Sequence, residues 1–313
     1  MDKIPLLVIV GPTASGKTAL AVECALEFGG EVVSADSMQI YKGMSIATAK
    51  PTADEMKGVK HRLIDFVDVT DNYSVADYVK DANEAIDAIF GEGKLPTLCG
   101  GTGLYVDSLV NNIRFSQEET DGELRRRLEE KMEKIGAEAM LEELAQFDPE
   151  TAEKLHENNR KRIIRAFEVY MSTGKTFSEM QVLSREEPSR FNPVFIGIGF
   201  EDRQKLYDRI DRRVDIMLEN GLVEEAREYY DLPEKTTSSQ AIGYKELKPY
   251  FEGEITLEQA IDNLKLATRH YAKRQLTWFR RNENIRWFNF DTYTDFKSFS
   301  DDVKEYARRK LYE

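Results

Sequence analysis

The chain has 313 residues, 41% of them hydrophobic and 32% charged, with a formal net charge of −13 at pH 7. This length fits one large domain or two ordinary ones, and the absence of any run of about 18 apolar residues excludes a membrane-spanning helix. The first residues show no signal-peptide pattern, and Cys24 and Cys99 lie in apolar runs without Cys-x-x-Cys spacing, so we expect reduced thiols and a cytoplasmic protein.

The first predicted element is a buried strand over residues 6–10, which leads through a glycine-containing loop into a helix over residues 17–28. The loop fits the phosphate-binding pattern Gly-x4-Gly-Lys-[Ser/Thr] in the strand–loop–helix context that the pattern requires. It consists of Gly11, Pro12, Thr13, Ala14, Ser15, Gly16, Lys17 and Thr18. We expect its amides and Lys17 to hold an anion and Thr18 to bind Mg²⁺. The loop alone leaves open whether the anion is a nucleotide or another diphosphate.

A second strand is predicted over residues 31–35, and Asp36 follows it directly. In an open α/β sheet, ligands lie outside the carboxyl ends of the strands, so Asp36 should lie beside the phosphate loop. There its carboxylate could bind Mg²⁺ through water or act as a general base. Alternatively, Asp36 caps the next turn, a position that Asp favours.

Further strands are predicted over residues 63–67, 96–99 and 194–200. A helix over residues 53–59 is predicted between the second and third strands, and one over residues 74–90 between the third and fourth. Strands that alternate with helices indicate a parallel sheet covered on both faces. The fold class that we predict is therefore α/β, a P-loop NTPase-like parallel sheet with helices on both faces.

Only helical patterning occurs over the middle of the chain, which predicts an all-helical insertion domain. A second Gly-Lys-Thr there, residues 174–176, lacks the first glycine of the pattern and follows a helix, so we interpret it as a helix–helix turn. After the insertion, helices are predicted over residues 203–220, 223–230 and 257–281. The domains are the first part of the core, 1–114, the insertion, 115–190, and the completion of the core with the C-terminal helices, 191–313.

The strand at residues 96–99 ends in GGTGLY, residues 100–105, rather than in an acid. A P-loop hydrolase usually has an acidic residue at such a strand end, where it holds Mg²⁺ and water. The glycines suggest a tight loop at an anion or sugar edge, with Thr102 as its side-chain donor. The alternative is a strand-to-helix turn that simply needs glycines.

Charge is unevenly placed along the chain. Residues 117–157 carry 14 acidic and 6 basic residues, residues 158–176 carry 5 basic and one acidic, and residues 267–281 carry 5 basic residues, no acid and interleaved aromatics. A local basic surface matters more to a phosphate backbone than the total charge does. The basic stretches are either nucleic-acid contacts or solvated helix faces, and charge alone does not decide between them.

Six stretches occur together in one order over nearly the whole chain. They are the phosphate loop, then SADSMQIYKGMSIATAKP, GGTGLY, NNRKRIIRAFEVY, QAIGYKE and TRHYAKRQLTWFR. In this combination the sequence resembles the bacterial tRNA dimethylallyltransferase family, isopentenyltransferases that act on adenosine. The resemblance implies transfer of a dimethylallyl group from dimethylallyl diphosphate to N6 of adenosine 37, beside the tRNA anticodon, with release of diphosphate. It also implies Mg²⁺ as cofactor, and we expect a monomer.

Such a reaction would explain the missing acid, because no water has to be activated. Cleavage of an allylic carbon–oxygen bond leaves negative charge on the diphosphate, which a preorganised loop, Mg²⁺ and cations stabilise. The exocyclic amine of adenine is a poor nucleophile, so a group that accepts its proton would help.

The resemblance also implies roles for individual residues. Catalytic roles fall to Asp36 as the base and to Thr13, Lys17 and Arg213 at the diphosphate, with Arg209 and Arg212 as alternatives for the arginine. Contacts to tRNA fall to Asp36, Ser37, Met38, Gln39, Thr102, Arg125, Arg160, Lys161, Arg162, Ile163 and Ile164. Gly243, Tyr244 and Lys245 are expected to line the substrate channel, and the alternative is that they form only the first turn of a helix. The acidic first half of the insertion must then face away from RNA.

Two other functions remain compatible with these residues. A nucleoside or small-molecule kinase with a helical lid would also need the phosphate loop, Asp36 and an arginine-bearing helix, and ATP would then be the ligand of the loop. A nucleotide-gated interaction module could use the basic and aromatic stretch 267–281 as its contact surface.

Overall fold

The computed structural model describes residues 3–115, 122–232 and 237–312. The chain divides into two compact units, one formed by residues 1–110 and 190–313 and the other by residues 111–189. Among the helices in the described ranges, none has the length and apolar character needed to cross a membrane.

The first unit is built on a six-stranded parallel sheet with the order β3-β2-β4-β1-β5-β6. The strands are β1 (Ile4–Val10), β2 (Glu31–Ser34), β3 (His61–Arg62), β4 (Pro96–Gly100), β5 (Phe191–Gly199) and β6 (Arg286–Asn289). In the central strands the register sets Val8 of β1 opposite Leu98 of β4 and Phe195 of β5. Because these strands are buried on both faces, they are continuous apolar runs in the sequence.

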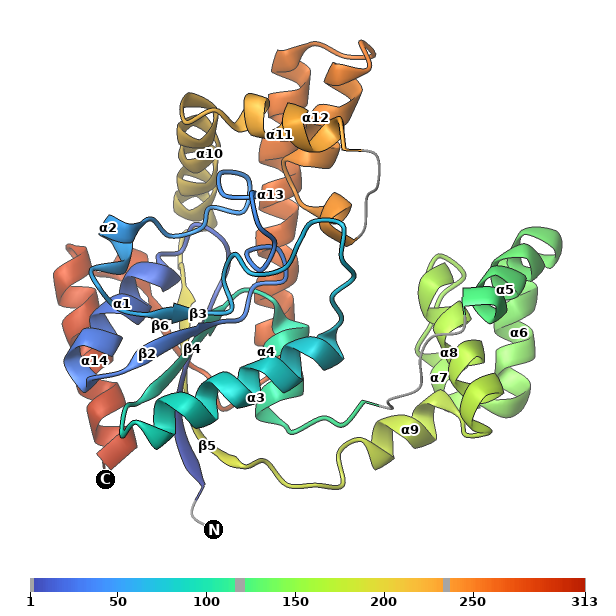
Figure 1. Cartoon of the computed structure of the whole chain (residues 1–313), viewed down its shortest axis with the longest axis horizontal. Coiled ribbons are helices and arrows are strands. Elements are labelled where there is room, and N and C mark those ends of the chain that lie inside the picture. Colours follow the sequence, from blue (N-terminus) through green and yellow to red (C-terminus); the bar gives the residue numbers. More distant parts are fainter. Residues whose placement is uncertain (1–2, 116–121, 233–236, 313) are drawn as a thin grey trace. The chain divides into compact units, whose positions relative to one another are not determined.

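Helices cover both faces of the sheet (Figure 1). Leu7 and Ile9 of β1 point into a core with α1 (Lys17–Phe28) and α14 (Phe296–Tyr312). The alternate β1 residues point into a core with α3 (Val75–Gly91) and α4 (Gly103–Val110). The two-residue period of the strand thus divides one apolar run between two cores.

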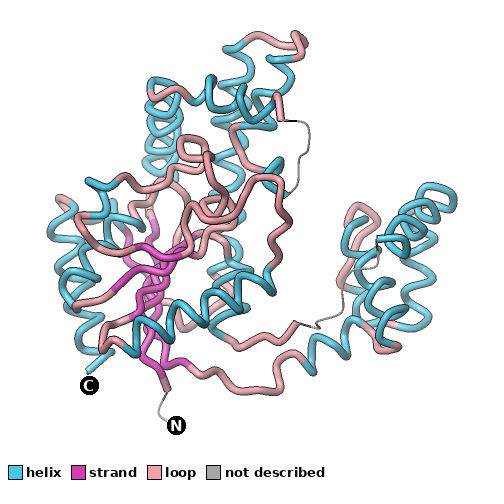
Figure 2. Tube along the Cα trace, viewed as in Figure 1, coloured by secondary structure: helices cyan, strands magenta, loops and turns pink. Residues whose placement is uncertain are grey.

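A group of helices lies beyond the carboxyl ends of the strands, and the loops that leave the strands lie between these helices and the sheet (Figure 2). These helices are α10 (Arg203–Glu219), α11 (Leu222–Tyr230), η1 (Thr237–Gln240), α12 (Tyr244–Phe251) and α13 (Leu257–Phe279). They share a core with the segment after β2, including Ile40 and Met44. The short helices α2 (Ala53–Met56) and η2 (Phe290–Thr292) complete this unit.

The second unit is helical throughout its assigned elements. These are α5 (Gly122–Ile135), α6 (Ala137–Phe147), α7 (Pro149–Glu153), α8 (Arg160–Thr173) and α9 (Phe177–Leu183), which share one apolar core. Gly174 ends α8 in a left-handed conformation, and Thr176 starts α9 with a capping box. The second Gly-Lys-Thr is therefore a helix–helix turn, as predicted, because its glycine and threonine act as helix stop and start signals.

Two strand assignments differ from the sequence-based expectation. The strand predicted over residues 63–67 is wrong, since β3 covers only His61–Arg62 and both Leu63 and Asp65 have positive φ, which interrupts an extended conformation. The prediction also missed β6, a four-residue edge strand with little buried surface. The helix predicted over residues 53–59 ends at Met56, where Lys57 adopts a left-handed conformation.

A tight backbone approach at the end of β4 generates a testable prediction. A Cβ atom on Gly100 would lie 2.1 Å from the carbonyl oxygen of Ala35, which is backbone and cannot move aside easily. We therefore expect Gly100→Ala to lower the free energy of unfolding by about 1–3 kcal/mol, measured by urea denaturation. Gly91→Ala is the control, because no atom lies within 4 Å of its added Cβ apart from its chain neighbours and the backbone of its own helix. Equal midpoints for the two variants would contradict the prediction.

Candidate active site

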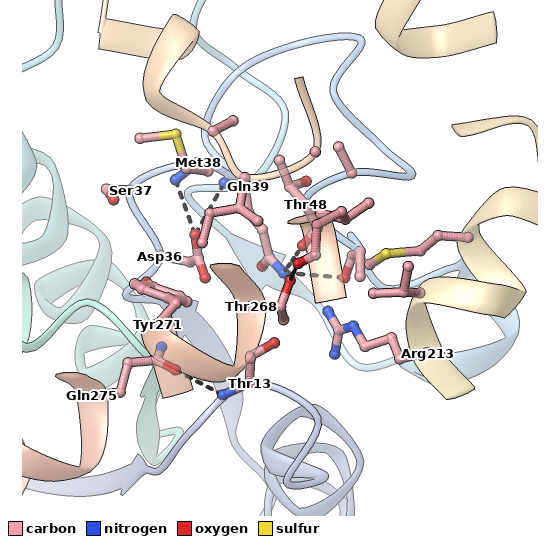
Figure 3. A pocket seen from close by; sticks show the side chains of 18 of the residues that line it. Thr13, Asp36, Ser37, Met38, Gln39, Thr48, Arg213, Thr268, Tyr271 and Gln275 are labelled. Carbon is pink, nitrogen blue, oxygen red and sulfur yellow. Dashed lines mark hydrogen bonds between the residues drawn. The ribbon is translucent and has the colours of Figure 1, made fainter. Parts of the chain in front are cut away.

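A cavity of about 240 Å³ lies in the first unit, where the ends of β1, β2 and β4 approach α10–α13 (Figure 3). Three of the predicted site segments contribute residues to its wall. The phosphate loop contributes Thr13, Lys17 and Thr18, the segment after β2 contributes Asp36, Ser37, Met38 and Gln39, and α10 contributes Arg213. The structure thus brings together in one cavity residues that are far apart in the sequence.

The backbone of the phosphate loop depends on its two glycines. Gly11 has φ +154°, and a Cβ there would lie 2.9 Å from the carbonyl oxygen of Ile198 in β5. Gly16 has φ +95° and precedes α1, whose N-terminus receives no side-chain cap. The first amides of α1 therefore remain available to an anion at the positive end of the helix. Pro12, Ala14 and Ser15 are buried behind this surface.

Lys17 carries an ammonium group in a poorly hydrated position. Burial lowers its pKa to about 8; the neighbouring Arg213 also lowers it, while Cys99 and Asp36 act in the opposite direction. The ammonium donates a hydrogen bond to the carbonyl oxygen of Pro12 at 2.7 Å. A second negative group in the cavity would favour the charged form of Lys17 and raise its pKa again.

The three candidate arginines of α10 have different environments. Arg213 lines the cavity, and burial lowers its pKa. Within the described part of the chain, Arg213 makes no hydrogen bond or ion pair. Arg209 instead donates to the carbonyl oxygen of Ala14 at 2.8 Å and lies over the ring of Phe290, while Arg212 is exposed. Of the three, Arg213 is the cation available to an anion in the cavity.

Asp36 fills the capping role, one of the alternatives that the sequence left open. Its Oδ1 accepts hydrogen bonds from the amides of Met38 at 2.9 Å and Gln39 at 3.3 Å, so the side chain caps the turn that follows β2. No donor among the described residues bonds to Oδ2. One oxygen therefore holds the carboxylate in place, and the other remains able to accept a proton or bind a cation.

Thr102 acts on this turn from the GGTGLY loop. Its amide donates to the carbonyl oxygen of Ala35, and its Oγ1 accepts from the amide of Ser37 at 3.0 Å. Thr102 does not belong to the cavity wall, so it supports the segment that carries Asp36. A Cβ on the nearby Gly101 would lie 2.1 Å from Nε2 of Gln275, so this side chain would have to shift.

Gln275 of α13 connects two loops of the site. Its Oε1 accepts from the amide of Thr13 at 2.8 Å, and its Nε2 donates to the carbonyl oxygen of Gly101 at 3.0 Å. Figure 3 shows the first of these bonds at the edge of the cavity. A single buried side-chain amide thus joins α13 to the phosphate loop and to the glycine loop.

The stretch 267–281, for which the sequence suggested a contact surface, also forms part of the cavity wall, a role that was not predicted for its individual residues. Thr268, Tyr271 and Gln275 follow a three- and four-residue spacing, which places them on one face of the helix, and Arg274 lies beside them. Burial and the charge of Asp36 raise the pKa of Tyr271. One signal in the sequence could have identified this wall. It is the row of polar residues on the same helix face as the buried Leu264.

The stretch QAIGYKE contributes in part as expected. Gly243 and Lys245 line the cavity, together with Gln240, Ala241 and Ile242. Tyr244 does not line it, because its hydroxyl turns toward Glu225 of α11 and donates a hydrogen bond there at 2.9 Å.

The expected RNA-contact residues of the insertion all lie in the second unit. The side chains of Ile163 and Ile164 are buried in its core, and a contact of these two residues with tRNA stays a prediction. Lys161 and Arg162 are exposed and form no ion pair with the described residues. Arg160 pairs with Glu133, and Arg125 pairs with Glu129 and with the buried Glu168.

The oxygen atoms of the cavity fit Mg²⁺. The Thr18 hydroxyl and the Asp36 carboxylate both line it, and over the described ranges no group of three or more His, Cys, Asp or Glu residues could form a metal cage by itself. Mg²⁺ typically takes few protein oxygens and completes its shell with water and substrate phosphates. This donor set therefore suits a metal that arrives with a phosphate ligand.

A family model described as IPP transferase matches residues 39–282. The chain belongs to this family. A tRNA dimethylallyltransferase from Acetivibrio thermocellus is 49% identical over 308 residues, which cover 98% of this chain and 97% of the relative. A tRNA dimethylallyltransferase from Bacillus subtilis is 43% identical over 310 residues, which cover 99% and 98% of the two chains.

Solved structures of this family have the same fold. A full-length tRNA isopentenylpyrophosphate transferase from Bacillus halodurans superimposes with a TM-score of 0.74 at 44% identity, over 99% of this chain and 97% of the other. A eukaryotic dimethylallyltransferase acting on tRNA superimposes with a TM-score of 0.82 at 30% identity, over 97% of this chain and 78% of the other.

The environment of Lys17 predicts how anion binding depends on pH. Below pH 8 the ammonium is charged, whereas above it the empty site loses the proton and must regain it when an anion binds, which costs about 1.4 kcal/mol per pH unit. We expect the affinity for inorganic diphosphate with Mg²⁺ to fall between pH 8 and 9.5, with proton uptake on binding, measured by calorimetry in buffers of different ionisation enthalpy.

Lys17→Met is the control, because it removes the ionisation of the lysine and leaves the ionisation of the diphosphate unchanged. The variant should bind more weakly at pH 7 and take up no proton from this site. A wild-type pH profile identical in shape to that of Lys17→Met would contradict the prediction.

Proposed function

We propose that this chain transfers a dimethylallyl group from dimethylallyl diphosphate to N6 of adenosine 37 in tRNA and releases diphosphate. The observation that carries the proposal is one cavity with two kinds of wall. Lys17, Thr18 and Arg213 contribute cationic and polar groups to it, while Val214, Met217, Leu222 and Leu264 contribute apolar surface. A ligand that joins a diphosphate to a short hydrocarbon chain matches both parts. The names of the relatives support the same reaction.

The cationic and polar groups of the cavity suit the departing diphosphate. When the allylic carbon–oxygen bond breaks, negative charge grows on the diphosphate oxygens, near the Lys17 ammonium, the Arg213 guanidinium and the first amides of α1. These groups are partly desolvated, so their interaction with the growing charge is stronger than it would be in water. Bound Mg²⁺, held by the Thr18 hydroxyl and phosphate oxygens, would supply further positive charge there.

Asp36 is the proton acceptor in this proposal. As the bond from adenine N6 to the allylic carbon forms, the amine must lose a proton, and the carboxylate accepts it through Oδ2, the oxygen not used in the turn. The bonds to the Met38 and Gln39 amides keep the carboxylate directed while it does so. Such general-base assistance typically contributes about 10²–10⁴-fold to the rate.

The acceptor nucleotide must leave its stack for its exocyclic amine to enter a cavity of this kind. Contacts to the RNA backbone would hold the stem while the base is extruded, and phosphate contacts position RNA without reading its sequence. We assign this part to the second unit, through the exposed cations Lys161 and Arg162 at the start of α8.

A labelling experiment tests the proposal against the kinase alternative. The protein is incubated with Mg²⁺, unmodified tRNA and labelled dimethylallyl diphosphate, and in parallel with ATP labelled on its terminal phosphate and nucleoside acceptors. Label on adenosine 37, located by mass analysis of the tRNA digest, supports the proposal. Transfer of phosphate to an acceptor without prenylation would refute it, and binding without turnover in either reaction would favour an interaction module.

The geometry of Asp36 allows a conservative substitution. Asn at this position keeps an oxygen for the Met38 and Gln39 amides but cannot accept the proton. We expect Asp36→Asn to lower kcat by about 10²–10⁴-fold while the tRNA dissociation constant stays within about twofold, measured by single-turnover transfer and filter binding. Asp71→Asn, an exposed carboxylate, is the control. Unchanged turnover in Asp36→Asn would remove the base role.

The unpaired cations of α8 predict a salt effect. Replacing Lys161 and Arg162 by Ala should weaken tRNA binding and reduce the slope of log affinity against log salt by about 1 for each RNA phosphate that is no longer neutralised. The matched control replaces Arg126 and Lys154, which are already paired with Glu130 and Glu150. Identical slopes for the wild type and the Lys161 and Arg162 variant, measured by titration at several salt concentrations, would show that this face is only solvated.

A further inference from the structure

The loop between β2 and α2 is held by a carboxylate from another part of the fold. Glu225, in the first turn of α11, accepts hydrogen bonds from three successive backbone amides, those of Ser45 at 2.8 Å, Ile46 at 2.7 Å and Ala47 at 2.9 Å. Three amides that converge on one anion form a concave site of the kind that binds phosphate or carboxylate in other proteins. Here the anion is a side chain of the same chain.

Both oxygens of Glu225 are used. Oε2 accepts from Ser45 and Ile46, and Oε1 accepts from Ala47 and from the hydroxyl of Tyr244. Hydrogen bonds to an ionised carboxylate are about twice as strong as those between neutral groups. Glutamine in place of Glu225 would keep one acceptor oxygen and replace the other by an NH₂ group. The two donors that face this NH₂ group would lose their hydrogen bonds.

The loop held in this way is connected to the proposed base. Nε2 of Gln39 donates to the carbonyl oxygens of Thr48 and Ala49, each at 3.1 Å, and the amide of Gln39 donates to Oδ1 of Asp36. Figure 3 shows this side chain reaching from the Asp36 turn toward the loop. Gln39, Thr48 and Ala49 all line the cavity. A continuous set of contacts thus leads from Glu225 through the loop and Gln39 to Asp36.

We propose that Glu225 is a positioning residue of the transfer reaction, whose carboxylate fixes residues 45–49 so that Gln39 keeps Asp36 directed at the acceptor amine. This inference rests on the proposed function. Glu225 does not belong to the cavity wall, so it acts through the loop rather than on a substrate. Apolar packing of Met44 and Ile46 against α11 and α12 keeps the loop attached without it. Loss of the carboxylate therefore loosens the loop rather than unfolding the protein.

The test compares three variants of the full-length chain. Glu225→Gln removes the carboxylate, Glu224→Gln makes the same charge change at the preceding residue, which is exposed, and Tyr244→Phe removes the fourth donor while keeping the three amides. We expect Glu225→Gln to lower kcat about ten- to a hundredfold with little change in the KM for tRNA, because small misplacements of a catalytic group have effects of this size. Both other variants should stay within about twofold of the wild type.

Hydrogen exchange gives a readout that does not depend on activity. Because Gln keeps one acceptor oxygen, either the amides of Ser45 and Ile46 or the amide of Ala47 should exchange at least about tenfold faster in Glu225→Gln than in Glu224→Gln. Unchanged exchange at these amides would overturn the inference, as would wild-type kcat in Glu225→Gln or an equal loss in Tyr244→Phe. If the wild type transfers no label, the proposed function fails and the catalytic part of the inference with it, while the exchange data still decide whether Glu225 holds the loop.

Discussion

The site depends on the confinement of two cations and one carboxylate at the carboxyl end of a parallel sheet. Lys17 and Arg213 are both desolvated enough that their pKa values are lowered, and the charge of Arg213 lowers the pKa of Lys17 further. Cys99 and Asp36 act on the pKa of Lys17 in the opposite direction. A cavity in this condition favours an incoming anion, because the anion stabilises charges that the fold has placed out of water. Holding these cations close together costs free energy, and this cost falls when negative charge appears on a leaving group.

Several contacts that hold the site are made to backbone atoms rather than to the side chains that would do chemistry. The turn after β2 is fixed by Thr102 from one side and by Gln39 from the other, and both act on amides or carbonyl oxygens. Gln275 likewise bonds to the backbone at Thr13 and Gly101. Such contacts constrain the position of Asp36 and the phosphate loop, while they leave the side chains that face the cavity free to meet a ligand.

The parts that could be predicted from the sequence are those that local patterns determine. The phosphate loop needs its glycines for positive φ, and the buried strands need continuous apolar runs, so both are recognisable in isolation. The third strand was misplaced because positive φ at Leu63 and Asp65 has no clear signal in residues of these types. The α13 wall was missed because Thr268, Tyr271 and Gln275 become a site only when tertiary packing turns their face toward the loops. The choice among Arg209, Arg212 and Arg213 likewise required the structure.

The bridge formed by Gln275 limits the ways in which this scaffold can change. Because one amide group both accepts from Thr13 and donates to Gly101, the last turns of α13 cannot shift outward without breaking hydrogen bonds to two loops at once. The wall formed by Met217, Leu222 and Ile242 consists of apolar side chains, which form no hydrogen bonds of this kind themselves. A descendant of this protein that came to accept a bulkier hydrocarbon would gain room on that side, by trimming side chains of α10 and α11, while the side facing α13 kept its shape.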